Sequence, residues 1–163
     1  MATKNDIGKR IYVVAGVPAT NDAAGFEALA WVWARYHVTL PQLGITHNEI
    51  EIPDMEQGFN QIVKGAATGV TTTMSFRVDD DDRANAGQVI AKGQAIDEDG
   101  IISIKIVDGS GADGAPATGD LVQYAQGIVH SFQPNQGTTD SYEGFQITFR
   151  QNQRTVEATE PAA

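Results

Sequence analysis

Three glycines in the second half of the chain have the spacing of a phosphate-binding turn. Gly109, Gly111 and Gly114 follow an apolar run and satisfy the pattern G-x-G-x-x-G. In dinucleotide-binding proteins this spacing makes a tight turn that places a phosphate at the N-terminus of the next helix. Here Pro116 continues a glycine-rich stretch and no helical pattern follows. We therefore interpret residues 109–120 as a flexible loop and expect no nucleotide cofactor.

Catalytic and metal-binding patterns are weak in this sequence. His37, His47 and His130 do not have i, i+4 spacing and belong to no zinc-ligand pattern. The chain contains no cysteine, and none of its serines stands in a G-x-S-x-G nucleophile elbow. We expect no catalytic residue, no metal site and no cofactor, so the sequence does not indicate an enzyme.

Trp31 and Trp33 are two residues apart, so on a strand they would lie on one face. Such a pair can stack on a sugar or a base, but tryptophans more commonly pack in a core or a subunit interface. We favour packing, and name Trp31, Trp33, Gly111 and Gly114 as candidate subunit-interface residues. The surrounding segment, 26–38, is itself ambiguous, because its aromatic and β-branched residues favour a strand while its first residues suit a helix equally well.

Other segments alternate apolar and polar residues with the period of a half-buried strand. The clearest are residues 70–78 and the hairpin 126–150. On the first strand of that hairpin, Ile128 shares a face with His130 and Phe132. Three phenylalanines are expected to point into the core: Phe76, Phe145 and Phe149.

A further strand is expected from residue 45 to Pro53. Ile50 and Ile52 would be buried on one face, while Glu49 and Glu51 leave the core together on the other. These two glutamates are therefore candidates for an acidic surface.

One helix is expected between the strands, from residue 83 to 95. The aspartates at 79–82 come before it and would cap its N-terminus. The apolar stripe of this helix would consist of four residues: Ala86, Val89, Ile90 and Gly93.

This order of elements predicts a mainly β fold, a β-sandwich or barrel with one flanking α-helix. A length of 163 residues suits one domain with its own core. We place that domain at residues 11–150, between a flexible N-terminal arm, 1–10, and a flexible C-terminal arm, 151–163. No apolar run approaches the roughly 20 residues of a membrane helix. The formal net charge of −10 argues against a broad surface that binds nucleic acid, because such binding needs clustered Lys and Arg.

The closing hairpin carries a longer pattern. G-x-V-x-S-F-x-x-N-x-G-T-x-D-S begins at Gly127, and the next strand ends in T-F-R at Arg150. This pattern resembles the end of the major tail tube proteins of long-tailed, siphovirus-type bacteriophages. The order of strand, acidic turn, helix, strand, loop and closing hairpin over residues 50–150 is similar as well. The resemblance implies a tail-tube-like fold and a structural virion protein.

The resemblance also implies an assembly. Subunits would form hexameric rings stacked into a hollow tail, built in the host cytoplasm, through which DNA passes without tight binding. A tape measure protein, a tail terminator and distal tail proteins would be partners, with no membrane involved. Glu49 and Glu51 are then candidate lumen-facing residues. Two alternatives stay open: a secretion-system tube protein of the related fold, and a monomeric β-sandwich module that binds carbohydrate.

Overall fold

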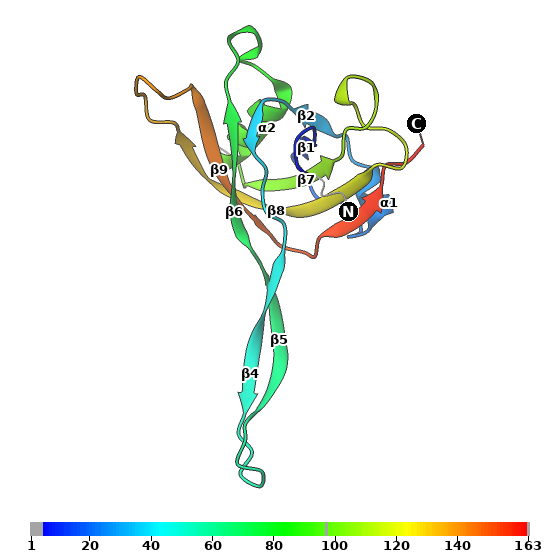
Figure 1. The fold of residues 1–163 in the computed structure, drawn as a ribbon, viewed down its shortest axis with the longest axis vertical. Helices are drawn as coiled ribbons and strands as arrows, with labels where there is room; N and C mark the ends of the chain where they lie inside the picture. The colour runs from blue at the N-terminus through cyan, green and yellow to red at the C-terminus, as the bar shows by residue number, and fades with distance from the viewer. Residues whose placement is uncertain (1–4, 97, 163) are drawn as a thin grey trace.

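Eight strands form one curled antiparallel sheet in the computed structural model, which describes residues 5–96 and 98–162 (Figure 1). Along the sheet their order is β2-β1-β7-β8-β9-β6-β3, and β10 pairs with β8. The strands are β1 (Arg10–Val14), β2 (Val32–Ala34), β3 (His37–Thr39), β6 (Thr71–Arg77), β7 (Ile101–Val107), β8 (Leu121–Pro134), β9 (Gly144–Gln151) and β10 (Val156–Thr159). The expected mainly β fold is confirmed.

The two outer strands of this sheet are neighbours in sequence. β2 and β3 are joined by Arg35 and Tyr36 alone, so the chain itself brings the two ends of the sheet together. Tyr36 has a φ of 64°, an uncommon left-handed conformation that turns the corner. Its carbonyl accepts a hydrogen bond of 2.9 Å from the N–H of Arg77, at the end of β6. The sheet is therefore curled into a barrel-like shape.

Helix α2 (Ala86–Ile96) packs against β1, β2 and β8, close to the expected position of the helix. Its buried residues are Gly87, Gln88 and Ala91, whereas Val89 is 54% exposed. The predicted stripe is therefore right only in part, since Ile90 packs against the core but Ala86 and Val89 are exposed. A Cβ at Gly87 would lie 2.4 Å from the Cα of Ala34, so a glycine is needed where the helix approaches β2.

The core confirms the alternation on β6 and β9, since the side chains of Phe76, Phe145 and Phe149 are buried. On β8 the expected grouping is right in part. Ile128 and His130 both point outward, opposite the buried Val129, but Phe132 packs against the core, because the register of β8 against β9 shifts between Val129 and Ser131.

The segment 26–38 contains parts of both expected structures. A short helix, α1 (Ala23–Glu27), covers its beginning, and β2 and β3 follow. α1 buries Phe26 in a second apolar cluster with Val107, Val122 and Tyr124.

Both expected arms differ from the structure where it describes them. Val156–Thr159 forms β10, and next to it Glu160 makes a nearly buried ion pair of 2.9 Å with Lys105 of β7. The C-terminal segment is thus tied to the sheet. At the other end β1 already begins at Arg10, and residues 1–4 of the expected arm lie outside the described residues.

Strands β4 (Ile45–Ile52) and β5 (Gln61–Gly69) form a separate two-stranded hairpin. It extends away from the body along the longest axis of the molecule (Figure 1). Val70 alone separates β5 from β6, so the hairpin continues directly from the sheet. Within the described residues, no helix is long and apolar enough to cross a membrane.

Candidate assembly surfaces

One face of the β4–β5 hairpin is apolar and lies open. Residues directly opposite in an antiparallel pair share a face, and here Ile50 is opposite Val63 and Ile52 is opposite Gln61. Ile50 is 51% exposed and Val63 43% exposed. The expectation that Ile50 and Ile52 are buried is therefore wrong for the single chain, although they do share a face. Together with Val63 they form what we call the hairpin apolar face.

The opposite face of the hairpin carries charge. Glu49 is opposite Lys64, and Glu51 is opposite Ile62, whose side chain is also exposed. The amide of Asn60 donates a hydrogen bond of 2.6 Å to Glu51 Oε1. Glu49 and Glu51 thus share a face, as the sequence predicted. Which surface of an assembly this charged face meets stays a prediction.

The tip of the hairpin exposes two further large side chains. Met55 is 98% exposed and Phe59 is 76% exposed. Asp54 shapes this turn, because its carboxylate accepts hydrogen bonds from the N–H groups of Glu56 and Gln57 at 3.0 and 3.2 Å. Exposed apolar side chains gathered on one projecting element indicate a surface that is covered in an assembly.

The two tryptophans lie in different surroundings. Trp31 packs against Phe26 and Tyr124 and donates its indole N–H to the carbonyl of Phe26 at 2.9 Å. Trp33 is on β2, between the guanidinium groups of Arg10 and Arg35. Trp31 therefore contributes to the packing of its own chain, and only Trp33 lies in a groove open to solvent.

The glycine motif forms a braced turn. Gly111 precedes a 3-10 turn at Ala112–Gly114, and its N–H donates to the carbonyl of Ala115 at 2.7 Å. The hydroxyl and backbone N–H of Ser110 both donate to Asp120. The next element is β8, so this turn does not present the N-terminus of a following helix to a phosphate. A role for Gly111 and Gly114 at a subunit interface stays a prediction.

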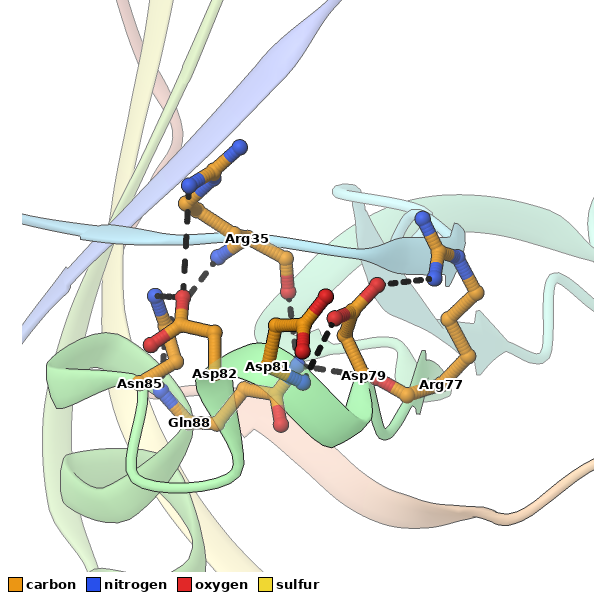
Figure 2. Close-up of polar contacts among 7 residues, drawn as sticks. All are labelled: Arg35, Arg77, Asp79, Asp81, Asp82, Asn85 and Gln88. Atoms are coloured by element: carbon orange, nitrogen blue, oxygen red, sulfur yellow. Dashed lines mark hydrogen bonds and ion pairs between the residues drawn. The ribbon is translucent and has the colours of Figure 1, made fainter.

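Figure 2 shows how the start of α2 fastens the corner of the sheet. The side-chain amide of Gln88 donates to the carbonyl of Arg35 at 2.7 Å and to that of Arg77 at 3.0 Å. The oxygen of Asn85 accepts from the N–H groups of Arg35 and Gln88, both at 3.3 Å. Two buried amides thus tie the β2–β3 corner to the end of β6.

The aspartate run lies beside this corner (Figure 2). Asp79 accepts from the N–H of Asp81 at 3.0 Å and pairs with Arg77 at 3.2 Å, while Asp82 lies 4.0 Å from Arg35. Two residues therefore do the capping that was predicted for the aspartates. Asp79 caps the 3-10 turn Asp80–Asp82, whereas Asn85 supplies the oxygen at the start of α2. In residues 5–96 and 98–162, no three His, Asp or Glu side chains are grouped to hold a metal ion.

Burial alters two titrating groups in the body. It raises the pKa of Tyr124 to about 12, with the nearby carboxylates of Glu160 and Glu27 acting in the same direction. It also lowers the pKa of His37 below its usual value. Neither residue belongs to a cluster that would perform acid–base chemistry; both reflect packing.

No protein-family model matches the sequence, and no curated protein matches it. Solved structures do match. The SPP1 tail tube has a TM-score of 0.61 at 14% identity, over 94% of this chain and 78% of its own. The tail of an empty GTA particle, computed with C6 symmetry, has a TM-score of 0.54 at 9% identity over 99% and 100%. The sheath–tube complex of an extracellular contractile injection system, PVC, has a TM-score of 0.55 at 13% identity over 93% and 89%.

These matches define the class of fold: the chain has the fold of tail tube proteins. The resemblance read from the closing hairpin is thereby confirmed at the level of structure.

The sequence did not predict three features of these surfaces. They are the hairpin apolar face, the hydrogen bonds of Gln88 and Asn85 at the β2–β3 corner, which we call the clamp, and the arginine side chains that stack on Trp33. The alternation at Ile50 and Ile52 was visible, but alternation does not say whether the apolar side packs within the same chain. The stack depends on contacts between β1, β2 and β6, which no local pattern reveals.

Proposed function

We propose that this protein is the tube subunit of a long-tailed phage or phage-derived particle. Copies of the chain form hexameric rings, and the rings stack into a hollow tube through which DNA passes. The tail tube fold over nearly the whole chain supports this role, and so does the sixfold symmetry with which the tail of the GTA particle was computed.

The β4–β5 hairpin is the observation that carries the proposal. A two-stranded hairpin is marginal on its own in water, and this one keeps Ile50, Ile52 and Val63 exposed while it projects from the body (Figure 1). Contact with a neighbouring subunit would bury that face and hold the hairpin. The hairpin is therefore understandable as part of an assembly rather than as part of an isolated domain.

The remaining partners follow from this role. A tape measure protein, a terminator and distal tail proteins would contact the tube, which is built in the host cytoplasm and ends up in the virion. The net charge of −10 suits a channel that repels DNA instead of binding it. The role is structural, and we infer no enzymatic activity.

Negative-stain microscopy of the purified protein tests the proposal. Tubes of constant diameter with sixfold end views are expected as the concentration rises. A protein that stays monomeric at high concentration would contradict the proposal and favour the carbohydrate-binding module.

A tube of an injection or secretion system is a second candidate, favoured by the match to the PVC sheath–tube complex. The genes beside this one separate the two. A tape measure gene and a portal gene indicate a phage tail, whereas a sheath gene without a portal indicates an injection system.

The charged face of the hairpin is proposed to line the channel. Replacing Glu49 and Glu51 by lysine would place a basic belt in every ring, and each additional phosphate contact steepens the log–log salt dependence of DNA binding by roughly 0.9. Particles with both substitutions should eject DNA slowly at low salt and normally at high salt. Ejection that is unchanged at every salt concentration would show that this face lies elsewhere.

A further inference from the structure

Three arginines and two aromatic rings alternate in one stack at the β2–β3 corner. The guanidinium carbon of Arg10 lies 3.8 Å from the centre of the Trp33 ring, and that of Arg35 lies 4.8 Å from both Trp33 and Tyr36. Arg77 completes the stack at 4.5 Å from Tyr36. Stacking on an aromatic face holds a guanidinium in a fixed plane while its N–H groups stay available at the edge.

The stack lines a groove of about 400 Å³. Its lining includes four of the chain's 11 basic residues, namely Lys9, which is paired with Asp6 at 2.7 Å, Arg10, Arg35 and Arg77, whereas Asp113 is the one acidic residue that lines it within the described chain. Such a concentration is notable in a protein with a net charge of −10. The groove is thus suited to a group that carries negative charge.

The nearby carboxylates do not occupy all the N–H donors of the stacked arginines. Arg77 pairs with Asp79 at 3.2 Å, and Arg35 is 4.0 Å from Asp82. Arg10 donates one hydrogen bond, of 3.0 Å, to the backbone carbonyl of Asp113. A guanidinium has five N–H donors, and the side chains of Arg35 and Arg77 are 44% and 49% exposed. Planar, preorganised guanidinium groups of this kind are suited to carboxylates.

The β4–β5 hairpin has the complementary charge. Between Ile45 and Gly69 it has one basic residue, Lys64, and four acidic residues, so its formal charge is −3 with His47 neutral. The acidic residues are Glu49, Glu51, Asp54 and Glu56. They lie on the strands and at the tip, where Asp54 and Glu56 are beside the exposed side chain of Met55.

The hairpin cannot reach the groove of its own chain. Arg77 is at the end of β6 that is distant from the hairpin, and β5 and β6 run on with only Val70 between them. At about 3.3 Å per residue, the 17 residues 61–77 span up to roughly 55 Å between the hairpin tip and Arg77. Contact between these two regions therefore needs a second copy, and a contact between different surfaces of identical chains repeats from copy to copy.

We propose that the arginine–aromatic groove binds the acidic β4–β5 hairpin of a second copy of this chain. The inference rests on the proposed function, because it assigns the acceptor surface for the hairpin within the tube. The carboxylates at the hairpin tip, Asp54 and Glu56, would meet the edges of the stacked guanidinium groups, which sets both the direction and the register of stacking, while Glu49 and Glu51 on the strand stay free to line the channel. Nucleic acid phosphate is the alternative occupant that the test must exclude.

Two oppositely altered variants test the pairing. R10E/R77E makes the groove acidic, and E56K/Q57K makes the hairpin tip basic. Each variant alone should need at least a tenfold higher concentration than the native protein to form tubes, because its groove and hairpin carry charge of the same sign. An equimolar mixture should assemble near the native concentration, since each variant then offers the charge that the other lacks. The control K92E/R150E changes the net charge as much as R10E/R77E does, outside the groove, and should assemble as the native protein does.

Circular dichroism on each variant first establishes that it is folded. If native protein forms tubes and folded R10E/R77E forms them at the same concentration, the inference is overturned while the proposed function stands. A folded mixture that stays unassembled also overturns it. Normal tubes of R10E/R77E that have lost binding of a labelled DNA oligonucleotide would assign the groove to phosphate instead. If the native protein forms no tubes, the proposed function fails first.

Discussion

The body and the β4–β5 hairpin are both built from antiparallel strands, but they bury their apolar side chains differently. In the body, Phe76 and Phe149 are fully buried in a core cluster that also includes Ala91 of α2. In the hairpin, Ile50 and Ile52 alternate with glutamates just as regularly, yet both stay largely exposed. Alternation therefore specifies which residues share a face, and the presence of a partner decides whether that face is buried.

Because of this difference, the body and the hairpin have different roles. The body has what an independent domain needs: a core, a helix cap and a closed corner. The hairpin has strand pairing without a core, so its stability as a folded element depends on assembly. Substitutions in the two regions should therefore have different consequences, one for the folding of the monomer and the other for the growth of the tube.

The largest expected effect is in the body core. Phe149→Ala should lower the free energy of unfolding by about 3–5 kcal/mol, because it removes a fully buried ring and leaves a cavity. Phe59→Ala at the exposed hairpin tip should change it by less than about 0.5 kcal/mol. Urea titration of the monomer measures both values. Equal losses for the two variants would remove the distinction between body and hairpin.

The alternation in the sequence correctly predicted which faces of β9 and β6 are buried, because Phe145, Phe149 and Phe76 pack inside the same chain. It did not reveal the bulge on β8 beside Val129, which depends on the register against β9. The inner face of α2 was not fully predicted because it includes Gly87 and Gln88. Gly87 allows the helix to approach β2 closely, and Gln88 forms hydrogen bonds, so neither residue follows a hydrophobic pattern.

The C-terminal strand β10 was missed for a related reason. Val156 is the only large apolar residue between 151 and 163, so the segment looks like a polar arm. Its place in the sheet comes from backbone pairing with β8, supported by the ion pair between Glu160 and Lys105. At the candidate site, Glu49 and Glu51 were correctly placed on one face, but the groove around Trp33 needed the tertiary structure.

The clamp at the corner should contribute less than the core. Gln88→Ala leaves the carbonyls of Arg35 and Arg77 without their 2.7 and 3.0 Å partners. An unsatisfied buried acceptor costs about 1–3 kcal/mol, and urea titration should show a loss in that range. Asn60→Ala removes an exposed side-chain hydrogen bond in the hairpin and is the matched control, expected within about 0.5 kcal/mol of the native protein. A neutral Gln88→Ala variant would mean that the corner is held by packing alone.

The hairpin apolar face should show the opposite behaviour. Ile50→Asp should leave monomer unfolding unchanged and raise the concentration needed for tube formation at least tenfold, equivalent to about 1.4 kcal/mol per contact. Ile62→Asp introduces the same charge on the other face, opposite Glu51, and should assemble more readily than Ile50→Asp. Sedimentation of tubes at several protein concentrations gives both thresholds. If Ile62→Asp is the more damaging variant, the charged face is the one that contacts the neighbouring subunit.

The smallest expected effect is a pH dependence in the body. Burial lowers the pKa of His37 in the folded chain, whereas in the unfolded chain its value is about 6.5. The folded state then binds fewer protons than the unfolded state, so the stability present at neutral pH declines as the pH falls through 6.5. Thermal melts of the monomer between pH 7.5 and 5 should show this decline, and His37→Gln should make it shallower. His130→Gln, at an exposed position on β8, is the control. An identical slope for native protein and His37→Gln would show that His37 gains its proton in the fold as easily as in the unfolded chain.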